Sequence, residues 1–310
     1  MTESSLRPGA AAASVLVGMA MLGLTDNFVP FLTERGSLWQ FHLIRGAMAL
    51  VLLAIIAALG FGVLRPKSLR AVLGRSFFQA GAMLIYFGCL ALMPIGVVVA
   101  GIFTSPLFVL LITVIFQGKR VGPVRWGAVV LGFLGTLLVI RPDPSALDPI
   151  AFLPVFAGLL YAIGAVATRA WCAQENTLTL TAGFFGMLML FGLIGVLFLP
   201  AGGPAGHESF PVRGWVPIEA GFLFWTAVQA VGSLLGIGLI FRGYLMGEAG
   251  HVAVFEYSLL VFATFWAWVL WDQQVPMLAL VGMTMIACAG VIIALRTSVP
   301  TPLRVPRVPQ

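Results

Sequence analysis

The chain has 310 residues, of which 60% are hydrophobic and only 9% are charged, and its mean hydropathy is +1.06. Soluble proteins carry roughly 25% charged residues, so a soluble globule of this size could not cover its surface with polar groups. The net charge of +6 would suit a nucleic-acid partner, but the basic residues lie at the ends of apolar runs rather than in one patch. These properties exclude a soluble α/β domain and a nucleic-acid-binding protein, and they predict a membrane protein.

Ten apolar segments are each long enough to cross a bilayer, which takes about 20 residues at 1.5 Å per residue. The third and fourth segments are joined by a tight turn at Met93-Pro94-Ile95, and two prolines after Arg141 end the fifth. The proline-rich tail from Thr297 is expected to be disordered. We place the segments, in chain order, near residues 9–30, 38–62, 72–92, 96–116, 124–141, 149–171, 178–199, 218–243, 250–271 and 276–295.

A sequence repeat relates the two halves of the chain. Residues 86–141 align with residues 241–296 at a constant offset of 155 positions, so that Gly127 pairs with Gly282. Each half then holds five spans, and an odd number forces the second copy to enter the membrane in the opposite sense. We predict an all-α membrane protein with ten transmembrane helices in two inverted five-helix repeats. The predicted units are residues 1–145, residues 146–296 and a cytoplasmic tail at 297–310.

Lysine and arginine are distributed unevenly between the two sides of this predicted bundle. Cytoplasmic loops carry an excess of basic residues, so the side with 13 of them, rather than the side with three, should be cytoplasmic, and both termini lie on it. Arg45 falls inside the second span. The sparse side holds Arg35, Arg141 and Arg213, and the rich side holds Arg7, Arg65, Lys67, Arg70, Arg75, Lys119, Arg120, Arg125, Arg169, Arg242, Arg296, Arg304 and Arg307.

Several short patterns resemble the EamA-type family of the drug/metabolite transporter superfamily over about residues 12–296. The family repeats a proline, about ten apolar residues, Leu-Gly-Glu and a glycine-containing helix at the end of each half. This chain has Pro106 and Phe116-Gln117-Gly118-Lys119 in the first half, with a lysine in place of the glutamate. In the second half Val261 replaces the proline and Asp272-Gln273-Gln274 replaces Leu-Gly-Glu. The HLIRGAMAL run around Arg45 is similar to the basic residue of the family's second span, and the chain looks most like the YddG-type bacterial amino-acid exporters.

Two polar stripes, on the third and eighth spans, are candidates for the lining of a substrate cavity. Their members recur every three or four residues, which places them on one face of a helix. Such stripes also cement membrane helices to one another, so helix packing is the alternative interpretation. The resemblance implies a cavity lined by spans 1, 3, 4, 6, 8 and 9, which favours lining, and Tyr161 of span 6 would add a ring. The stripes comprise Gln79, Met83, Tyr86 and Leu90 on span 3, and Trp225, Gln229, Ser233 and Gly236 on span 8.

Glu256 and Tyr257 lie about two turns into the ninth span, deeper than an interfacial residue. A carboxylate in the bilayer is costly, so it must face a cavity or a cation. Arg45, His42 and His251 are the candidate partners, and a structural ion pair and a cavity-facing acid are both consistent with the sequence. If Glu256 faces the cavity, we expect it to attract a substrate amino group or a proton.

Three further residues are candidates for a gate or vestibule. Asp26 and Asn27 fall near the outer end of the first span, where they either line an outer vestibule or reach interfacial water. Pro106 lies in the middle of the fourth span and frees a backbone carbonyl, which Thr104 or a neighbour would satisfy. It could act as a hinge during gating.

The sequence thus predicts an inner-membrane carrier of bacteria that exports a small metabolite by alternating access. Amino acids, including aromatic ones, are the first choice of substrate, and a sugar, nucleoside or drug exporter, or a channel or sensor, is the alternative. An enzyme is disfavoured because no HExxH, Asp-rich or Gly-x-Ser-x-Gly pattern is present. Cys89, Cys172 and Cys288 share no metal-ligand spacing, so no metal or cofactor is expected. The expected partners are the substrate, the bilayer and a proton as candidate coupling ion, with the chain a monomer or weak homodimer.

Overall fold

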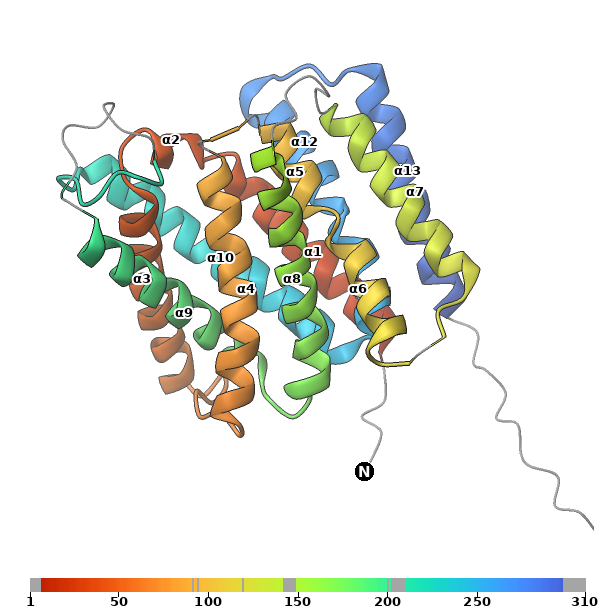
Figure 1. The fold of residues 1–310 in the computed structure, drawn as a ribbon, viewed down its shortest axis with the longest axis horizontal. Coiled ribbons are helices and arrows are strands. Elements are labelled where there is room, and N and C mark those ends of the chain that lie inside the picture. Colours follow the sequence, from red (N-terminus) through yellow and green to blue (C-terminus); the bar gives the residue numbers. More distant parts are fainter. Residues whose placement is uncertain are drawn as a thin grey trace, which may run out of the picture.

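The computed structural model describes residues 7–90, 92–93, 95–118, 120–141, 149–199, 201 and 210–297, and within these residues all regular structure is helical (Figure 1). The helices of the first half are α1 (Pro8–Asp26), α2 (Pro30–Thr33), α3 (Leu38–Ala58), α4 (Leu69–Cys89), α5 (Ile95–Ile102), α6 (Ser105–Ile115) and α7 (Pro123–Ile140). Those of the second half are η2 (Pro149–Ala151), α8 (Phe152–Trp171), α9 (Thr177–Phe198), α10 (Ala220–Met246), α11 (Ala249–Glu256), α12 (Ser258–Trp271) and α13 (Met277–Thr297).

Helix starts follow local sequence signals. Ser37, Ser68 and Asn176 each accept a hydrogen bond from the backbone N–H three residues later, which caps α3, α4 and α9. Proline occupies the first turn of α1 and α7, where its missing N–H costs nothing. These caps fix where the chain enters the helical bundle.

The described residues contain nine crossings that are long and apolar enough to span a membrane. Two of these crossings are composite, because α5 with α6 and α11 with α12 each make one. The 21-residue helix α4 is the tenth crossing; Arg70 and Arg75 lower its hydropathy, and it packs between α8 and α9. The predicted all-α membrane fold with ten spans is therefore confirmed.

The boundaries of three predicted spans need correction. The first span ends at Asp26, and the short helix α2 follows it instead of a continuous run to residue 30. The fourth and ninth spans, predicted as continuous helices, are both broken near their middle, after Ile102 and after Glu256.

Both breaks are closed by the same kind of hydrogen bond. The Thr104 hydroxyl donates to the Gly101 carbonyl at 2.6 Å, and the Ser258 hydroxyl donates to the Phe255 carbonyl at 2.6 Å. Irregular backbone is tolerated at membrane depth only when its polar groups find partners inside the protein. The carbonyl that Pro106 frees is that of Ile102, four residues earlier, so Thr104 satisfies a carbonyl at the break but a different one from that expected.

The packing of the helices follows the inverted repeat. In the first half α1 packs on α10 and on the broken pair α11–α12, and in the second half α8 packs on α4 and on the broken pair α5–α6. The helices α3 and α9, which correspond, pack on each other, as do α7 and α13, which run side by side in opposite directions in Figure 1. The starts of α7 and α13, at residues 123 and 277, are 154 positions apart, within one residue of the predicted offset.

The two ends of the bundle differ in charge. One end, here called the basic end, carries the start of α1, the end of α13 and the loop with Arg65 and Lys67 (Figure 1, lower edge). At the opposite end the Arg213 guanidinium donates to the Gly36 carbonyl at 2.7 Å, next to the first residue of α3. Arg65 follows the last residue of α3, so Arg65 and Arg213 lie at opposite ends of a 21-residue helix. This placement is the one that the predicted topology requires.

One residue of the predicted basic side is misplaced. Arg75 was assigned to a loop, but it lies in the second turn of α4 and is completely buried. Its Nε donates to the Thr168 hydroxyl at 2.8 Å and its Nη1 to the Leu180 carbonyl at 3.2 Å. Lys119, Pro94, the proline-containing linker at 142–148 and the tail at 298–310 lie outside the described residues.

Candidate substrate cavity

A cavity of about 120 Å³ lies in the middle of the bundle. Its walls come from α1, α3, α4, α8, α9 and α10 and from both helix breaks, which contribute Phe103 and Ser105 on one side and Glu256 on the other. Substrate sites of transporters with inverted repeats lie near the bilayer midplane beside such discontinuous helices. The mostly apolar wall with a few polar side chains is that of a site for a small organic molecule.

The cavity continues toward the end opposite the basic end. Asp26, Tyr86 and Phe87 line it and also line a second hollow, here called the mouth groove, which extends to Thr33 and Trp271. Beside the groove, the Trp225 ring stacks on Phe28 and Phe31 with centroids 4.8 and 4.9 Å away. The cavity therefore opens at the end where α1 and α4 terminate.

Opposite charges face each other at the mouth end of the cavity. Asp26 of α1 and Arg45 of α3 both line it, and they are close enough to attract each other electrostatically. The Arg45 guanidinium lies over the ring of Phe41, 4.6 Å from its centroid, and over that of Phe87, 5.2 Å away. Its Nη2 is 3.2 Å from His42 Nδ1. No ion pair joins Asp26 to Arg45 among the described contacts, so both groups can take a charged ligand.

Glu256 lies at the deep end of the cavity and is only 4% exposed. The Tyr161 hydroxyl from α8 donates to its Oε1 at 2.8 Å, and the Tyr244 hydroxyl from α10 donates to the same oxygen at 2.9 Å. In the described part of the chain, no side chain or backbone group donates to Oε2. Two neutral donors thus stabilise the carboxyl group, and no described ion pair joins it to a candidate cation of the ion-pair interpretation.

Gln79 of α4 also reaches the cavity, and it is 1% exposed. Neither its Oε1 nor its Nε2 has a hydrogen-bond partner among the described residues. The other amide of the predicted stripes behaves differently, because Gln229 Nε2 donates to the Thr25 carbonyl at 2.7 Å. Ser233 in turn donates to the Gln229 carbonyl. The stripe of α10 therefore joins helices as well as lining the cavity.

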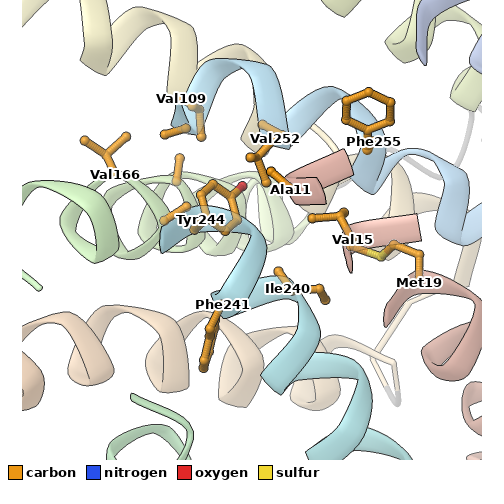
Figure 2. Packing of buried hydrophobic residues seen from close by; sticks show 14 of the residues in the cluster. Ala11, Val15, Met19, Val109, Val166, Ile240, Phe241, Tyr244, Val252 and Phe255 are labelled. Atoms are coloured by element: carbon orange, nitrogen blue, oxygen red, sulfur yellow. The ribbon is translucent and has the colours of Figure 1, made fainter. Parts of the chain in front are cut away.

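The basic end of the cavity is closed by packed apolar side chains. Ala11, Val109, Tyr244 and Val252, from four different helices, meet there and are completely buried (Figure 2). We call these four residues the plug. None of these four residues is among those that line the cavity.

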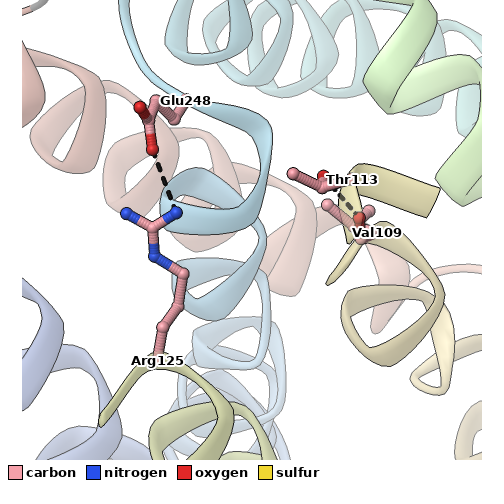
Figure 3. Close-up of polar contacts among 4 residues, drawn as sticks. All are labelled: Val109, Thr113, Arg125 and Glu248. Carbon is pink, nitrogen blue, oxygen red and sulfur yellow. Dashed lines mark hydrogen bonds and ion pairs between the residues drawn. The ribbon is translucent and has the colours of Figure 1, made fainter. Parts of the chain in front are cut away.

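Polar contacts lie outside the plug. Arg125 and Glu248 form an ion pair at 3.0 Å between α7 and the turn before α11, while Thr113 bonds within α6 to the Val109 carbonyl (Figure 3). The Arg169 guanidinium donates to the Leu245 carbonyl at 2.6 Å and so ties α8 to α10. Apolar packing and these contacts together close the basic end.

The structure brings most of the predicted residues to this cavity and places four of them elsewhere. Trp225 lies in the aromatic stack beside the mouth groove, because α2 covers its ring. Tyr257 packs against Gly132 of α7 and Phe103, on the far side of the helix break. Pro106 is buried within α6, and Asn27 lines only the mouth groove. The residues that line the cavity are Asp26, Gln79, Met83, Tyr86, Tyr161, Gln229, Ser233 and Glu256.

Sequence reasoning did not place several cavity residues. Arg45 was named only as a partner of Glu256, and Tyr244 was not singled out, although a tyrosine inside an apolar span is itself a signal. Phe184 and Phe241 line the cavity but look like any other apolar residue of a span. In the described residues no cluster of three or more His, Cys, Asp or Glu side chains could hold a metal ion.

Comparison with known proteins gives one family and several transporters. Residues 9–141 match the EamA-like transporter family. A riboflavin transporter of Rhizobium johnstonii is 30% identical over 172 residues, which are 56% of this chain and 55% of that protein. The pseudopaline exporter of Pseudomonas aeruginosa is 24% identical over 79% of this chain and 82% of that protein. An S-adenosylmethionine uptake transporter of Rickettsia bellii is 22% identical over 62% of each chain.

A solved crystal structure has the same fold. Its chain is 18% identical to this one and superposes on it with a TM-score of 0.70. The match covers 94% of this chain and 98% of that chain. Each of the three relatives above is named as a transporter or exporter. The YddG-type subdivision stays a prediction.

Proposed function

We propose that this multi-pass membrane protein, whose first half is an EamA-like transporter domain, is a carrier that exports amino acids or amino-acid-like zwitterions with a flat aromatic part. The observation that carries the proposal is the central cavity, which has opposite charges at its open end, aromatic walls, and a closed basic end. Relatives named for riboflavin, pseudopaline and S-adenosylmethionine support a small-metabolite substrate.

The charged pair suits a zwitterion. A substrate ammonium group would contact the Asp26 carboxylate, and a substrate carboxylate would contact the Arg45 guanidinium. Arginine binds carboxylates through paired N–H groups, and the low-dielectric surroundings strengthen both contacts. Both groups lie next to the mouth groove, so the charged part of the substrate keeps some access to water.

The walls suit a flat apolar group. Met83, Tyr86, Phe184 and Phe241 line the space between the charged pair and the deep end. Aromatic side chains stack on flat rings and supply large apolar contact areas. A cavity that combines apolar walls with a few placed polar groups is the usual form of a site for a small molecule.

The charge of the two ends sets the proposed orientation. Basic loops remain cytoplasmic, so the basic end faces the cytoplasm of a bacterial inner membrane and carries both termini. The cavity then opens to the outside, and the plug closes the cytoplasmic entrance. Alternating access requires a second state, in which the plug parts and the mouth closes.

Counterflow in proteoliposomes tests the substrate class. Vesicles preloaded with unlabelled compound are given labelled amino acids, sugars or nucleosides, and we expect exchange of aromatic amino acids. Asp26→Asn and Arg45→Gln should each reduce that exchange at least about tenfold, because each removes one charged contact. Arg242→Gln is the control, since this exposed arginine lies in α10 away from the cavity. Exchange of sugars without amino acids would contradict the proposal.

Glu256 is the proposed site for a proton or substrate amino group. Tyr161 and Tyr244 donate hydrogen bonds to its Oε1, and the positive charge of Arg75 acts electrostatically on Tyr161. If Glu256 takes part, wild-type transport varies with pH, and Glu256→Gln makes the rate lower and independent of pH. An identical rate and pH profile in the two proteins would remove Glu256 from the mechanism.

A further inference from the structure

We propose that Gln79 selects substrates whose flat group is a nitrogen heterocycle with a hydrogen-bond donor next to an acceptor, in preference to a hydrocarbon ring. This inference rests on the proposed function for the charged part of the substrate and adds the chemistry of the other part. The observation behind it is a buried amide that lines the cavity with both of its polar atoms unpaired.

An unpaired amide in this place is costly and therefore informative. Gln79 is 1% exposed, and a buried amide loses its bonds to water without replacement unless a ligand supplies them. Most buried side-chain polar atoms in proteins have a partner, so two unpaired atoms on one side chain require an explanation. A bound molecule that accepts from Nε2 and donates to Oε1 would satisfy both.

The neighbouring helix holds the Gln79 side chain in position. Gly164 of α8 lies directly against it, and a Cβ at position 164 would come within 2.5 Å of Gln79 Cγ. The glycine therefore leaves the space that the glutamine occupies. One side of the Gln79 side chain therefore packs against α8, and the residue also lines the cavity.

Arg75 and Tyr161 near Gln79 direct hydrogen bonds to other groups, while Arg75 Nη2 and Ser76 Oγ have no partner among the described residues. One turn earlier in α4, Arg75 donates to Thr168 and to the Leu180 carbonyl. Tyr161, one turn before Gly164 in α8, donates to Glu256. These bonds leave the Gln79 amide available, and Oε2 of Glu256 is a second acceptor at the deep end of the cavity.

The depth of Gln79 separates it from the zwitterion site. Gln79 precedes Tyr86 by seven residues in α4, which is about 10 Å along the helix axis, and Tyr86 lines the mouth groove with Asp26. A substrate whose charged part sits between Asp26 and Arg45 would thus extend its flat part toward Gln79. Phe184 and Phe241 line the cavity too and offer rings on which that part can stack.

An amide recognises a particular edge. Its carbonyl and NH₂ lie side by side in one plane, so it makes two parallel hydrogen bonds with a donor and an acceptor on adjacent ring atoms, as glutamine does with adenine. A hydrocarbon ring offers neither group and leaves the amide unpaired. Sites built around such hydrogen bonds reject analogues that lack them more strongly than apolar pockets reject a missing methylene.

Two matched probes test the proposal on the full-length protein in proteoliposomes. L-phenylalanine and L-3-(uracil-1-yl)alanine share the same amino-acid backbone, but only the uracil ring has a donor beside an acceptor. Each competes against labelled aromatic amino acid in counterflow. We expect the wild type to prefer the uracil compound by at least about tenfold. Gln79→Leu should abolish the preference by weakening only the uracil compound, and Phe77→Leu, at an exposed position of the same helix outside the cavity, should retain it.

The outcomes separate this inference from the proposed function. Equal potency of the two probes in the wild type, or equal losses for both in Gln79→Leu, would overturn the role of Gln79 while leaving zwitterion transport intact. Free uracil forms the third arm. If uracil competes in a Gln79-dependent way and amino acids do not exchange at all, the inference stands and the proposed zwitterion substrate fails.

Discussion

The two ends of the cavity are built from corresponding helices but differ in how they are closed. At the mouth, Asp26 lines a groove rimmed by aromatic rings, and Arg45 lines the cavity behind it. At the basic end, the plug of four apolar residues fills the corresponding space, with one ion pair outside it. Because the repeats are inverted, each end has the elements to adopt the other's arrangement. Under the proposed alternating access, the difference between the ends is a conformational state that variants should shift.

Accessibility of single cysteines should show the largest contrast. With Cys89, Cys172 and Cys288 replaced by serine, Thr33→Cys places a thiol in the mouth groove and Val252→Cys places one in the plug. Reaction requires contact with solvent, so a membrane-impermeant methanethiosulfonate should modify position 33 at least about 100-fold faster. The rates are measured by mass spectrometry. Fast modification of position 252 from the basic side would show that this end is open.

Overpacking next to the plug should have the next largest effect. A Cβ at Gly243 of α10 would lie 2.5 Å from Val15 Cγ2 and 3.2 Å from the Ala11 carbonyl oxygen. Gly243→Leu should therefore cost about 1–3 kcal/mol of stability and increase labelling of Val252→Cys. Thermal unfolding in detergent measures the first effect. Gly127→Leu is the control, since nothing lies within 4 Å of a Cβ there; equal stability of the two variants would contradict the packing described.

Removing the hydroxyl groups at the helix breaks should have smaller and matching effects. Thr104→Val and Ser258→Ala each delete one hydrogen bond to a backbone carbonyl of the preceding half-helix. Such bonds in membrane proteins contribute about 0.6 kcal/mol on average. We expect similar losses of thermal stability for the two variants and an additive loss for the double variant. A large loss in one variant alone would mean that the two breaks are not equivalent.

Breaking the ion pair should have the smallest effect. The Arg125 and Glu248 side chains are 28% and 42% exposed, so water screens them, and exposed pairs contribute about 0.2–1 kcal/mol. Glu248→Gln should raise labelling of Val252→Cys no more than about fivefold, and the charge swap Arg125→Glu with Glu248→Arg should restore the wild-type rate. An effect as large as that of Gly243→Leu would assign the closure of this end to charge instead of apolar packing.

The number and order of the spans could be predicted because bilayer thickness fixes the length of an apolar helix. The first helix break had a signal in Pro106, whereas the second has no proline and depends on the hydroxyl of Ser258. Periodicity placed Gln79 and Gln229 on the right faces. It could not show that α2 covers Trp225, or that Tyr257 lies beyond the break and packs on α7.

The partners of Glu256 could not be predicted for a different reason. Tyr161 and Tyr244 come from two other helices, and their positions depend on how α8 and α10 pack rather than on any local pattern. A cation is the partner that the sequence leads one to expect, because a buried carboxylate usually pairs with one. Here two neutral tyrosine hydroxyl groups donate to the buried carboxyl group instead, and only the three-dimensional structure shows this.

Two helix pairs, α3 with α9 and α7 with α13, each join corresponding members of the two repeats. If the two repeats exchange conformations, α3 still packs on α9 and α7 still packs on α13. The α1–α10 contact and the α4–α8 contact, in contrast, change places. A built Cβ at Gly135 lies 2.6 Å from the Gly282 carbonyl oxygen, and one at Gly282 lies 2.5 Å from that of Gly135, so the two backbones touch without intervening side chains. Under the proposed alternating access, this seam keeps the same partners in both states and would form the stationary frame against which the other helices move.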